Sequence, residues 1–541
     1  MSWITKLNIE ESLKEIISDE RQGKDFCLDP LRYEDLSLKK VKNKIIEEIN
    51  NKLISGTYTV RKLISIDVPK SNYILRPASR PSITDWIIYN AIVNFIISKI
   101  YKKIPKNSYS FNRFKDKFKR KKEHKKKTDY WLEFENDSIQ LSKNKNYEYL
   151  LVTDITSYFE HISLNVLKER LNLLSNDKDY NSAINFLVQN ILEKWTEDNK
   201  IPCFGLPQGP NTSLILADIY LYPVDKEMND NNIKFLRYMD DIRLFAKNIS
   251  ELKRNIKTLV IALRKLKLNL NPKKTTIYNL NDQKKLDEVF DPNRDLLNII
   301  DNIFRKRSNE AIEEIIPSLF SLYEKFQENG DFSERYLKFF IARVIDLMKF
   351  KLISKSKVLD LVKDLLNLFY EKHHLSDIFS WFFVASGKYA EEIAKIIQKK
   401  LIKFVCDKKV NIYEWQEMWA LDTIRQLGKI GKTELKKIGK KYSKHCEMCY
   451  SQFALISGQC GNTDEREAII NQEKYENDLY RTSLLAIQEL NKDIVIKSKL
   501  YLKADHYFRE YFDNLKPGKY YGFIYNLETV ELYIEYSTFD Y

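Results

Sequence analysis

Two adjacent aspartates, Asp240 and Asp241, lie in the middle of an apolar stretch, FLRYMDDIRLF, at residues 235–245. Apolar runs on both sides of a short polar break predict a β-hairpin over residues 233–248, with the acidic pair at its turn. Adjacent carboxylates repel each other, so such a turn is costly unless a cation binds there. Arg237 and Arg243 flank the pair and are expected to soften the repulsion. One acidic turn is weak support for a site, because aspartate also favours turns through its own hydrogen bonding.

A third aspartate offers a partner for this pair. Residues 148–159, EYLLVTDITSYF, form an apolar strand-like run that ends at Asp154. Asp154 precedes Asp240 by 86 residues, so the two carboxylates meet only if their strands are neighbours in one sheet. Converging carboxylates are the hard oxygen ligands that Mg²⁺ prefers, and a pair of such ions suits the transfer of a nucleotide to a hydroxyl.

Other segments carry groups that suit a nucleotide. The loop GLPQGP at residues 205–210 precedes an apolar helix; its glycines allow backbone to approach a ligand closely, and Gln208 can hydrogen-bond a nucleotide. Upstream, residues 68–86 offer Lys70 and Arg76 beside a predicted hairpin, and both suit a triphosphate. Downstream, residues 250–266 have helical apolar spacing and are followed by a turn at Asn271 and a strand, TTIYNL.

Charge points to a polyanionic partner. The chain of 541 residues has a formal charge of +14, although basic solvated surfaces are also common. Residues 113–127, RFKDKFKRKKEHKKK, hold ten Lys or Arg against two acidic residues. Such a block is either an exposed solvated segment or a track for a phosphate backbone. We expect the second, through Arg113, Lys119, Arg120, Lys121 and Lys122.

Four ordered segments, LLVTDITSYFEHI, GLPQGPNTS, LRYMDDI and LNLNPKKT, resemble motifs A to D of reverse transcriptases. The segments ILRPASRP and SYSFNRF resemble the fingers motifs that precede them, and the resemblance covers roughly residues 60–280. It implies an α+β right-hand polymerase with fingers and palm. It also implies that Asp154 and Asp240 hold two Mg²⁺ ions, or Mn²⁺, with help from the backbone oxygen of Ile155. Asp241 would support the pair.

The resemblance implies further roles. Phe159, five positions after Asp154, stands where the family carries an aromatic sugar gate, which predicts dNTP over NTP; a core aromatic is the alternative. Gln208 would contact the incoming nucleotide. Lys274 would act as general acid toward pyrophosphate, with Lys273 an equal candidate and a solvated turn lysine the alternative for either.

The chain changes character after residue 290. We expect an N-terminal helical extension at 1–60, reverse transcriptase fingers and palm at 61–290, and an α-helical domain at 291–510. The third part reads helix after helix, for example at 311–326, 336–350, 357–372 and 391–405, and is either a HEAT-like array or an irregular helical domain. A Tyr-rich tail at 511–541 alternates and predicts a terminal hairpin.

After motif D the chain departs from the usual reverse transcriptase pattern, and these departures indicate which group of reverse transcriptases it resembles. The chain shows no clear primer-grip motif, no "VTG" signature, no zinc-bearing endonuclease segment and no maturase pattern. It resembles instead the bacterial abortive-infection and defence-associated reverse transcriptases. That implies a helical domain in place of the thumb, template-independent and protein-primed DNA synthesis, and a trimer or hexamer. Copying of a partner non-coding RNA, a catalytically silent scaffold and an RNA polymerase remain alternatives; Phe159 disfavours the last.

These inferences set the expected partners and location. The partners would be dNTPs and a single-stranded DNA product, covalently attached to the protein. The chain has 33 tyrosines, so the sequence leaves the priming residue open, with Tyr33, Tyr58 and the tail as candidates. Six scattered cysteines, the lack of a signal-peptide pattern and the lack of a long uninterrupted apolar run predict a cytoplasmic protein that does not engage a membrane.

Overall fold

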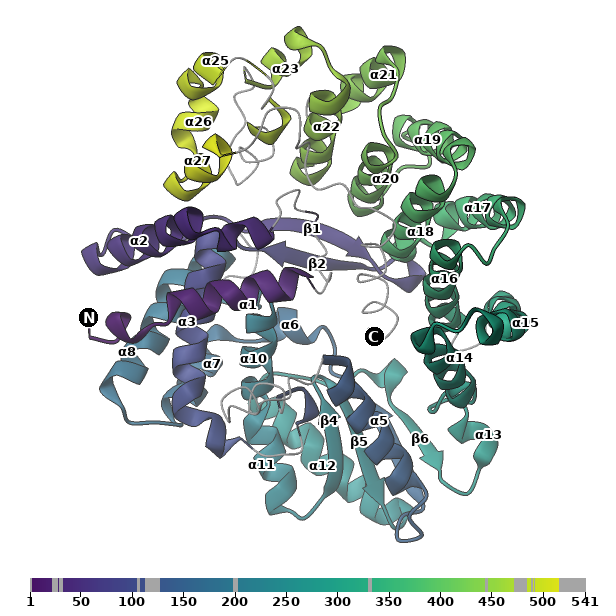
Figure 1. Ribbon diagram of the computed structural model, residues 1–541. Coiled ribbons are helices and arrows are strands. Elements are labelled where there is room, and N and C mark those ends of the chain that lie inside the picture. Colours follow the sequence, from purple (N-terminus) through teal and green to yellow (C-terminus); the bar gives the residue numbers. More distant parts are fainter. Residues whose placement is uncertain are drawn as a thin grey trace. The chain divides into compact units, whose positions relative to one another are not determined.

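The computed structural model describes residues 2–21, 28, 33–104, 108–111, 127–197, 203–328, 333–442, 446–470, 484–487, 490 and 492–514. The chain divides into two compact units. Figure 1 labels the helices and strands, coloured along the sequence. The first comprises residues 1–13, 52–63 and 83–292, and the second comprises residues 14–51, 64–82 and 293–541.

A four-stranded antiparallel sheet organises the first unit. Its strand order is β4-β5-β3-β6, with bounds β3 (Tyr149–Thr153), β4 (Lys234–Tyr238), β5 (Asp241–Ala246) and β6 (Thr276–Asn279). Strands β4 and β5 form the hairpin predicted from the sequence, and their last pair is Tyr238 with Asp241. Met239 and Asp240 are therefore a two-residue turn, and β3 lies beside β5 as the acidic residues required.

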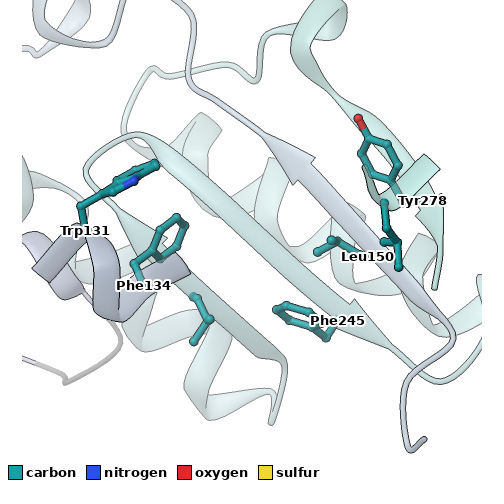
Figure 2. Packing of buried hydrophobic residues seen from close by; sticks show 7 residues of the cluster. Trp131, Phe134, Leu150, Phe245 and Tyr278 are labelled. Atoms are coloured by element: carbon teal, nitrogen blue, oxygen red, sulfur yellow. The ribbon is translucent and has the colours of Figure 1, made fainter. Parts of the chain in front are cut away.

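Helix α5 (Lys127–Ser142) covers one face of this sheet. Trp131 and Phe134 from α5 belong to one buried apolar cluster with Leu150, Phe245 and Tyr278 of the strands (Figure 2). Leu150 lies directly opposite Phe245 on one side and Tyr278 on the other, so the three form a cross-strand row on a single face. This apolar row fixes the register of β3, because a slip by one residue would turn it to the opposite face.

Helices α11 (Tyr222–Asp230) and α12 (Ile249–Lys265) pack against strands of the sheet as well as against each other. Leu252, Leu259 and Leu263 of α12 are buried at helical spacing, as the sequence predicted. The side chain of Asn248 caps the helix by accepting a hydrogen bond from the Glu251 N–H. The turn after α12 leads into β6, which is also as predicted.

Shorter helices complete the first unit: η1 (Ile4–Lys6), η4 (Tyr101–Lys103), α6 (Tyr158–His161), α7 (Leu164–Asn172), α8 (Lys178–Phe186), η5 (Leu187–Leu192), α9 (Glu193–Thr196), α10 (Asn211–Tyr220), η6 (Pro272–Lys274) and α13 (Gln283–Leu286). Helix α3 (Ile83–Ile100) is buried almost all round. By length and apolar composition Ile83–Lys103 could cross a membrane, but 83% of that window is buried within the structure. Core helices meet the same criterion, so this is weak support for a membrane span.

The second unit joins a two-stranded hairpin to a succession of helices. The hairpin consists of β1 (Ile64–Pro69), η3 (Ser71–Tyr73) and β2 (Leu75–Arg80), and β1 packs on α20 (Glu414–Gln426). The other elements are η2 (Tyr33–Ser37), α14 (Arg294–Lys306), α15 (Asn309–Gln327), α16 (Ser333–Phe350), α17 (Lys355–Glu371), η7 (His373–Leu375), α18 (Ser376–Tyr389), α19 (Glu391–Cys406), α21 (Lys432–Tyr442), α22 (Glu447–Cys460), α23 (Thr463–Ile470), α25 (Lys492–Lys497), α26 (Lys499–Lys503) and α27 (His506–Asp513). Helices α1 (Ile9–Arg21) and α2 (Lys39–Ser55) run from one unit into the other.

The helical succession after residue 290 is confirmed, and neighbouring helices pack on one another, for example α15 on α16 and α18 on α19 and α20. Its HEAT-like character stays a prediction. The expected boundary after residue 290 lies close to the division after residue 292. Residues 64–82, expected with the fingers and palm, group instead with the helices, because their apolar side chains are buried there. Residues 515–541, which include most of the expected tail hairpin, lie outside the described residues.

Candidate active site

The sheet register brings the acidic residues to one edge. Thr153 at the end of β3 pairs with Ile242 of β5, so Asp154 and Asp241 follow as neighbours on adjacent strands. Asp240 occupies the hairpin turn beside them. The sheet register thus brings Asp154 to the same edge of the sheet as Asp240 and Asp241.

Asp154 is the most buried of the three, with 8% of its surface exposed. Its Oδ2 accepts a hydrogen bond of 2.6 Å from Lys274 Nζ. Its Oδ1 is buried and has no hydrogen-bond partner among the described residues. Its backbone oxygen accepts from the Asn271 N–H at 2.9 Å, which anchors the end of β3 to the turn that carries Lys274. A buried carboxylate oxygen without a partner is costly, so this atom is suited to receive a ligand.

The carboxylates act on one another electrostatically. Burial, the Asp240 charge and the Asp154 charge together raise the pKa of Asp241 to about 7, against the opposing effect of Arg243 and Lys274. Burial is the largest cause of this shift, and repulsion by the neighbouring carboxylates adds to it. A bound cation would relieve the repulsion.

The structure distinguishes the two candidate lysines. Asn271 caps η6 by accepting from the Lys273 N–H, and this turn carries the Lys274 amine to Asp154. Burial lowers the pKa of Lys274, but the hydrogen bond and charge of Asp154 outweigh burial, so the net shift is upward. Both lysines are exposed, but Lys274 is held as a cation beside the carboxylates by its bond to Asp154.

A loop connects the carboxylate edge to Gln208. The Leu206 N–H donates to the Phe159 backbone oxygen at 3.0 Å, and the Gly205 N–H donates to Ile162 O at 2.9 Å. Gly205 has a φ of 95°, a conformation that favours glycine and lets the loop turn back on α6. Phe159 and Gln208 are both half-buried. Gln208 lies two residues after Leu206, whose N–H is bonded to Phe159, so one short segment connects Gln208 to Phe159.

The carboxylate oxygens at this edge can be compared with the ligands that a metal ion needs. Among the described residues, no three His, Cys, Asp or Glu side chains lie in an arrangement ready to hold a metal ion. The donor chemistry nevertheless fits a hard divalent cation. Asp154 Oδ1 is buried without a partner among the described residues, and burial together with the charges of Asp240 and Asp154 raises the pKa of Asp241. Asp154, Asp240 and Asp241 would hold such an ion, with Ile155 next to Asp154 on the backbone.

Comparison with known families agrees with this geometry. The family model described as "Reverse transcriptase (RNA-dependent DNA polymerase)" matches residues 68–307. The chain contains a reverse transcriptase domain. No curated protein matches the chain in the corresponding search. The sheet of strands β3 to β6 with its acidic edge lies within the matched residues.

Two groups of residues predicted for the reverse transcriptase site lie outside the described part of the first unit. Lys70 and Arg76 belong to the second unit, where the Lys70 N–H donates to Ile74 O at 2.6 Å and Arg76 lies opposite Val68 in the β1–β2 ladder. The basic residues Arg113, Lys119, Arg120, Lys121 and Lys122 lie outside the described residues. Their expected roles in the reverse transcriptase domain stay predictions.

One sequence interpretation is wrong. Arg237 was expected to soften the repulsion within the acidic pair, but its guanidinium binds the carboxylates of Asp218 and Asp225. Arg243 does lower the pKa of Asp241, while its own guanidinium pairs with Glu135. The sequence analysis missed Asp218 and Asp225 altogether. The available signal was Asp218 inside the apolar stretch LILADIYL, since an acidic residue on a buried face needs a partner.

Proposed function

We propose that this chain is a DNA polymerase that uses its reverse transcriptase domain to add deoxynucleotides to a hydroxyl group, in defence of a bacterial cell against phage. The polymerase activity rests on one observation above the others. Asp154 presents a buried, unpartnered carboxylate oxygen at the sheet edge where Asp240 and Asp241 also lie. Repelling carboxylates at one edge serve no structural purpose, so a domain without activity has no need to keep them.

The residues divide the reaction among them. Two divalent cations, when bound by the three aspartates, would activate the attacking hydroxyl and neutralise the triphosphate. Lys274, already protonated beside Asp154, is placed to donate a proton to the departing pyrophosphate. Gln208 would position the incoming nucleotide, and Phe159 would exclude a 2′-hydroxyl from the same pocket. Lys70 and Arg76 would bind the triphosphate.

The structure bears on how synthesis could begin. For a tyrosine to prime DNA synthesis, its hydroxyl must be exposed at the protein surface and not held in another hydrogen bond. The Tyr58 hydroxyl instead donates to Asp85 at 2.9 Å, and Tyr33 is buried against Arg80. Tyr73, by contrast, is largely exposed, at 69%. If synthesis is protein-primed, as proposed, Tyr73 and the tail tyrosines are better candidates than Tyr33 and Tyr58.

The remaining parts of the proposal come from the resemblance to abortive-infection enzymes. They are synthesis without a template, a homo-oligomer of three or six copies, action in the cytoplasm away from membranes, and a helical domain in place of the thumb. The helical succession that follows the reverse transcriptase domain supports the last of these. A DNA strand attached to the protein would be the product.

The test uses purified full-length protein incubated with dNTPs and Mg²⁺ and no nucleic acid. DNA should form and resist phenol extraction until proteolysis, and mass spectrometry of tryptic peptides should reveal a nucleotide on one tyrosine. Asp240→Asn should abolish the product, whereas Asp230→Asn, an exposed aspartate at the end of α11, should leave it unchanged. Absence of DNA with every primer and template offered would refute the polymerase.

A second candidate is RNA-templated synthesis, which the matched family's description as RNA-dependent DNA polymerase favours. Product that appears only when an RNA is added would establish it, and the partner would then be a non-coding RNA. A silent scaffold is the third reading. It would be established if the double variant Asp154→Asn with Asp240→Asn protected cells from phage as well as the unaltered protein does.

A further inference from the structure

The turn that carries Asp240 is strained. Met239 has a φ of 54°, a left-handed conformation that usually requires glycine, asparagine or aspartate. A long side chain in this conformation costs free energy, so surrounding contacts must hold the turn. Met239 directly precedes Asp240, which means that whatever fixes Met239 also sets the direction of the Asp240 carboxylate.

Both backbone polar groups of Met239 are held by side chains. Its N–H donates to Ser110 Oγ at 3.1 Å, and its carbonyl oxygen accepts from Arg237 Nη1 at 2.8 Å. Ser110 comes from a segment 129 residues earlier in the chain, and Arg237 comes from β4. The strained turn is therefore clamped from two sides by groups outside it.

The two clamping side chains meet on one carboxylate. Asp218 Oδ1 accepts from Ser110 Oγ at 2.8 Å, from Arg237 Nη1 at 2.8 Å and from Ser108 Oγ at 2.9 Å. Met239, Ser110, Asp218 and Arg237 thus form a closed ring of hydrogen bonds around the turn. Asp218 belongs to α10, the helix that directly follows the Gln208 loop, so the ring joins the nucleotide loop to the carboxylate turn.

A second carboxylate fixes Arg237. Its Nε and Nη2 donate to the two oxygens of Asp225 at 2.8 and 2.6 Å, a paired fork geometry that sets the plane of the guanidinium. Arg237 is 1% exposed and both aspartates are 0% exposed. Burial opposes its charge, but Asp225 and Asp218 outweigh burial and raise the pKa of Arg237, so the guanidinium stays charged.

A buried ion pair is weak support for stability, because desolvation offsets most of the attraction. The role of this network is therefore geometric: two buried carboxylates and an arginine together hold one strained residue, Met239, in place. We propose that Arg237, Ser110, Asp218 and Asp225 are positioning residues, which hold the turn so that the Asp240 carboxylate is oriented for metal binding. The inference rests on the proposed function, because it assumes that Asp240 is a metal ligand.

The test compares variants that loosen the clamp with variants that remove similar buried groups elsewhere. Ser110→Ala removes only the hydroxyl that holds the Met239 N–H, and its control is Ser138→Ala, a fully buried serine of α5 whose hydroxyl donates to Phe134 O. Arg237→Lys keeps the charge but loses the fork, and its control is Arg343→Lys, a buried arginine paired with Asp346 at 3.0 Å.

The readouts are Mn²⁺ affinity by electron paramagnetic resonance, the thermal midpoint, and separate kcat and KM values for dNTP. The inference expects Ser110→Ala and Arg237→Lys to weaken Mn²⁺ binding at least fivefold and to lower kcat at least tenfold, with dNTP KM within about threefold. Their thermal midpoints should fall no further than those of the controls. Mn²⁺ affinity within twofold of the unaltered protein in both variants would overturn it.

The metal readout keeps the two claims separable. If the unaltered protein binds Mn²⁺ but makes no DNA, and the two variants still weaken Mn²⁺ binding, the proposed polymerase function fails while the positioning role stands. If DNA is made but the variants match their controls in affinity and kcat, the polymerase stands and the positioning role is wrong.

Discussion

At the scale of single residues, the carboxylates at the sheet edge lower the unfolding free energy of the protein while they form a candidate ligand site. Asp241 shows this most clearly, because its pKa is raised to about 7 by burial and by Asp240. The unfolded chain has an ordinary aspartate pKa of about 3.9. Between these values the folded protein keeps a proton that the unfolded chain has lost, so the unfolding free energy falls as the pH rises from about 4 to about 7.

Asp241→Asn should therefore stabilise the metal-free protein. Asparagine cannot ionise, so in EDTA the variant should exceed the unaltered protein by on the order of 2 kcal/mol at pH 8, with a smaller advantage at pH 5. Thermal or urea unfolding at both pH values measures this. Asp230→Asn is the control and should show no such trend. An equal effect at both pH values would contradict the account.

Lys274 makes a second residue-scale prediction. Because its amine is hydrogen-bonded to Asp154 and its pKa is raised, it remains a proton donor at neutral pH. Lys274→Met should slow single-turnover nucleotide incorporation by roughly 10²-fold, the usual contribution of a general acid. The adjacent Lys273→Met changes the same charge on the same turn and should have an effect below about twofold. Equal losses in the two variants would show that local charge alone matters.

Phe159 makes a third. Its backbone oxygen accepts from the Leu206 N–H, and its ring is half-buried. Phe159→Ala should raise the ratio of NTP to dNTP incorporation by at least roughly tenfold, because the clash with the 2′-hydroxyl is removed. Competition between labelled nucleotides measures the ratio. A lower rate with an unchanged ratio would assign Phe159 to the core instead.

At the scale of elements, periodicity decided what the sequence could predict. Helices with one apolar face, such as α12 and α17, were predicted because their buried residues recur at helical spacing. Helix α18 was not predicted as a separate helix, because it is buried nearly all round and so has no polar face to set a period. The hairpin and the three aspartates were predictable from alternation and motif order. The Arg237 network was not, since its members are joined only by tertiary contacts.

Close packing of α22 gives an element-scale prediction. A Cβ added at Gly458 would lie 2.4 Å from the Ala486 backbone oxygen, so the backbone must move. Gly458→Ala should therefore lower the unfolding free energy by about 1–3 kcal/mol, the usual cost of overpacking. Gly431→Ala is the matched control, because its Cβ would also lie 2.4 Å from an oxygen, that of the flexible Glu434 side chain. Urea unfolding compares them, and equal losses would show that the Ala486 contact is not rigid.

At the scale of the whole molecule, the two units are interleaved in sequence. Each consists of three segments, and the chain passes from one unit to the other at residues 13, 51, 63, 82 and 292. The sequence analysis expected contiguous domains because composition changes once, near residue 290. It could not assign the β1–β2 hairpin, whose packing on α20 joins segments more than three hundred residues apart. A family match over residues 68–307 likewise crosses the division, so the domain of the family and the compact units differ.

The formal charge of +14 belongs to this scale and gives the last prediction. If the basic block at residues 113–127 contacts a phosphate backbone, its cations release counterions on binding, and affinity falls steeply with salt. Changing Lys119, Arg120, Lys121 and Lys122 to Gln should reduce the slope of log affinity against log salt by about 2–3 for a single strand. The control changes four exposed lysines of α19 and lowers the formal charge equally: Lys395, Lys399, Lys400 and Lys403. Fluorescence anisotropy with a labelled oligonucleotide measures both slopes. An equal reduction of the slope in both variants would show that binding follows net charge and that the basic block has no special role. A reduction only in the basic-block variant would identify the block as the contact.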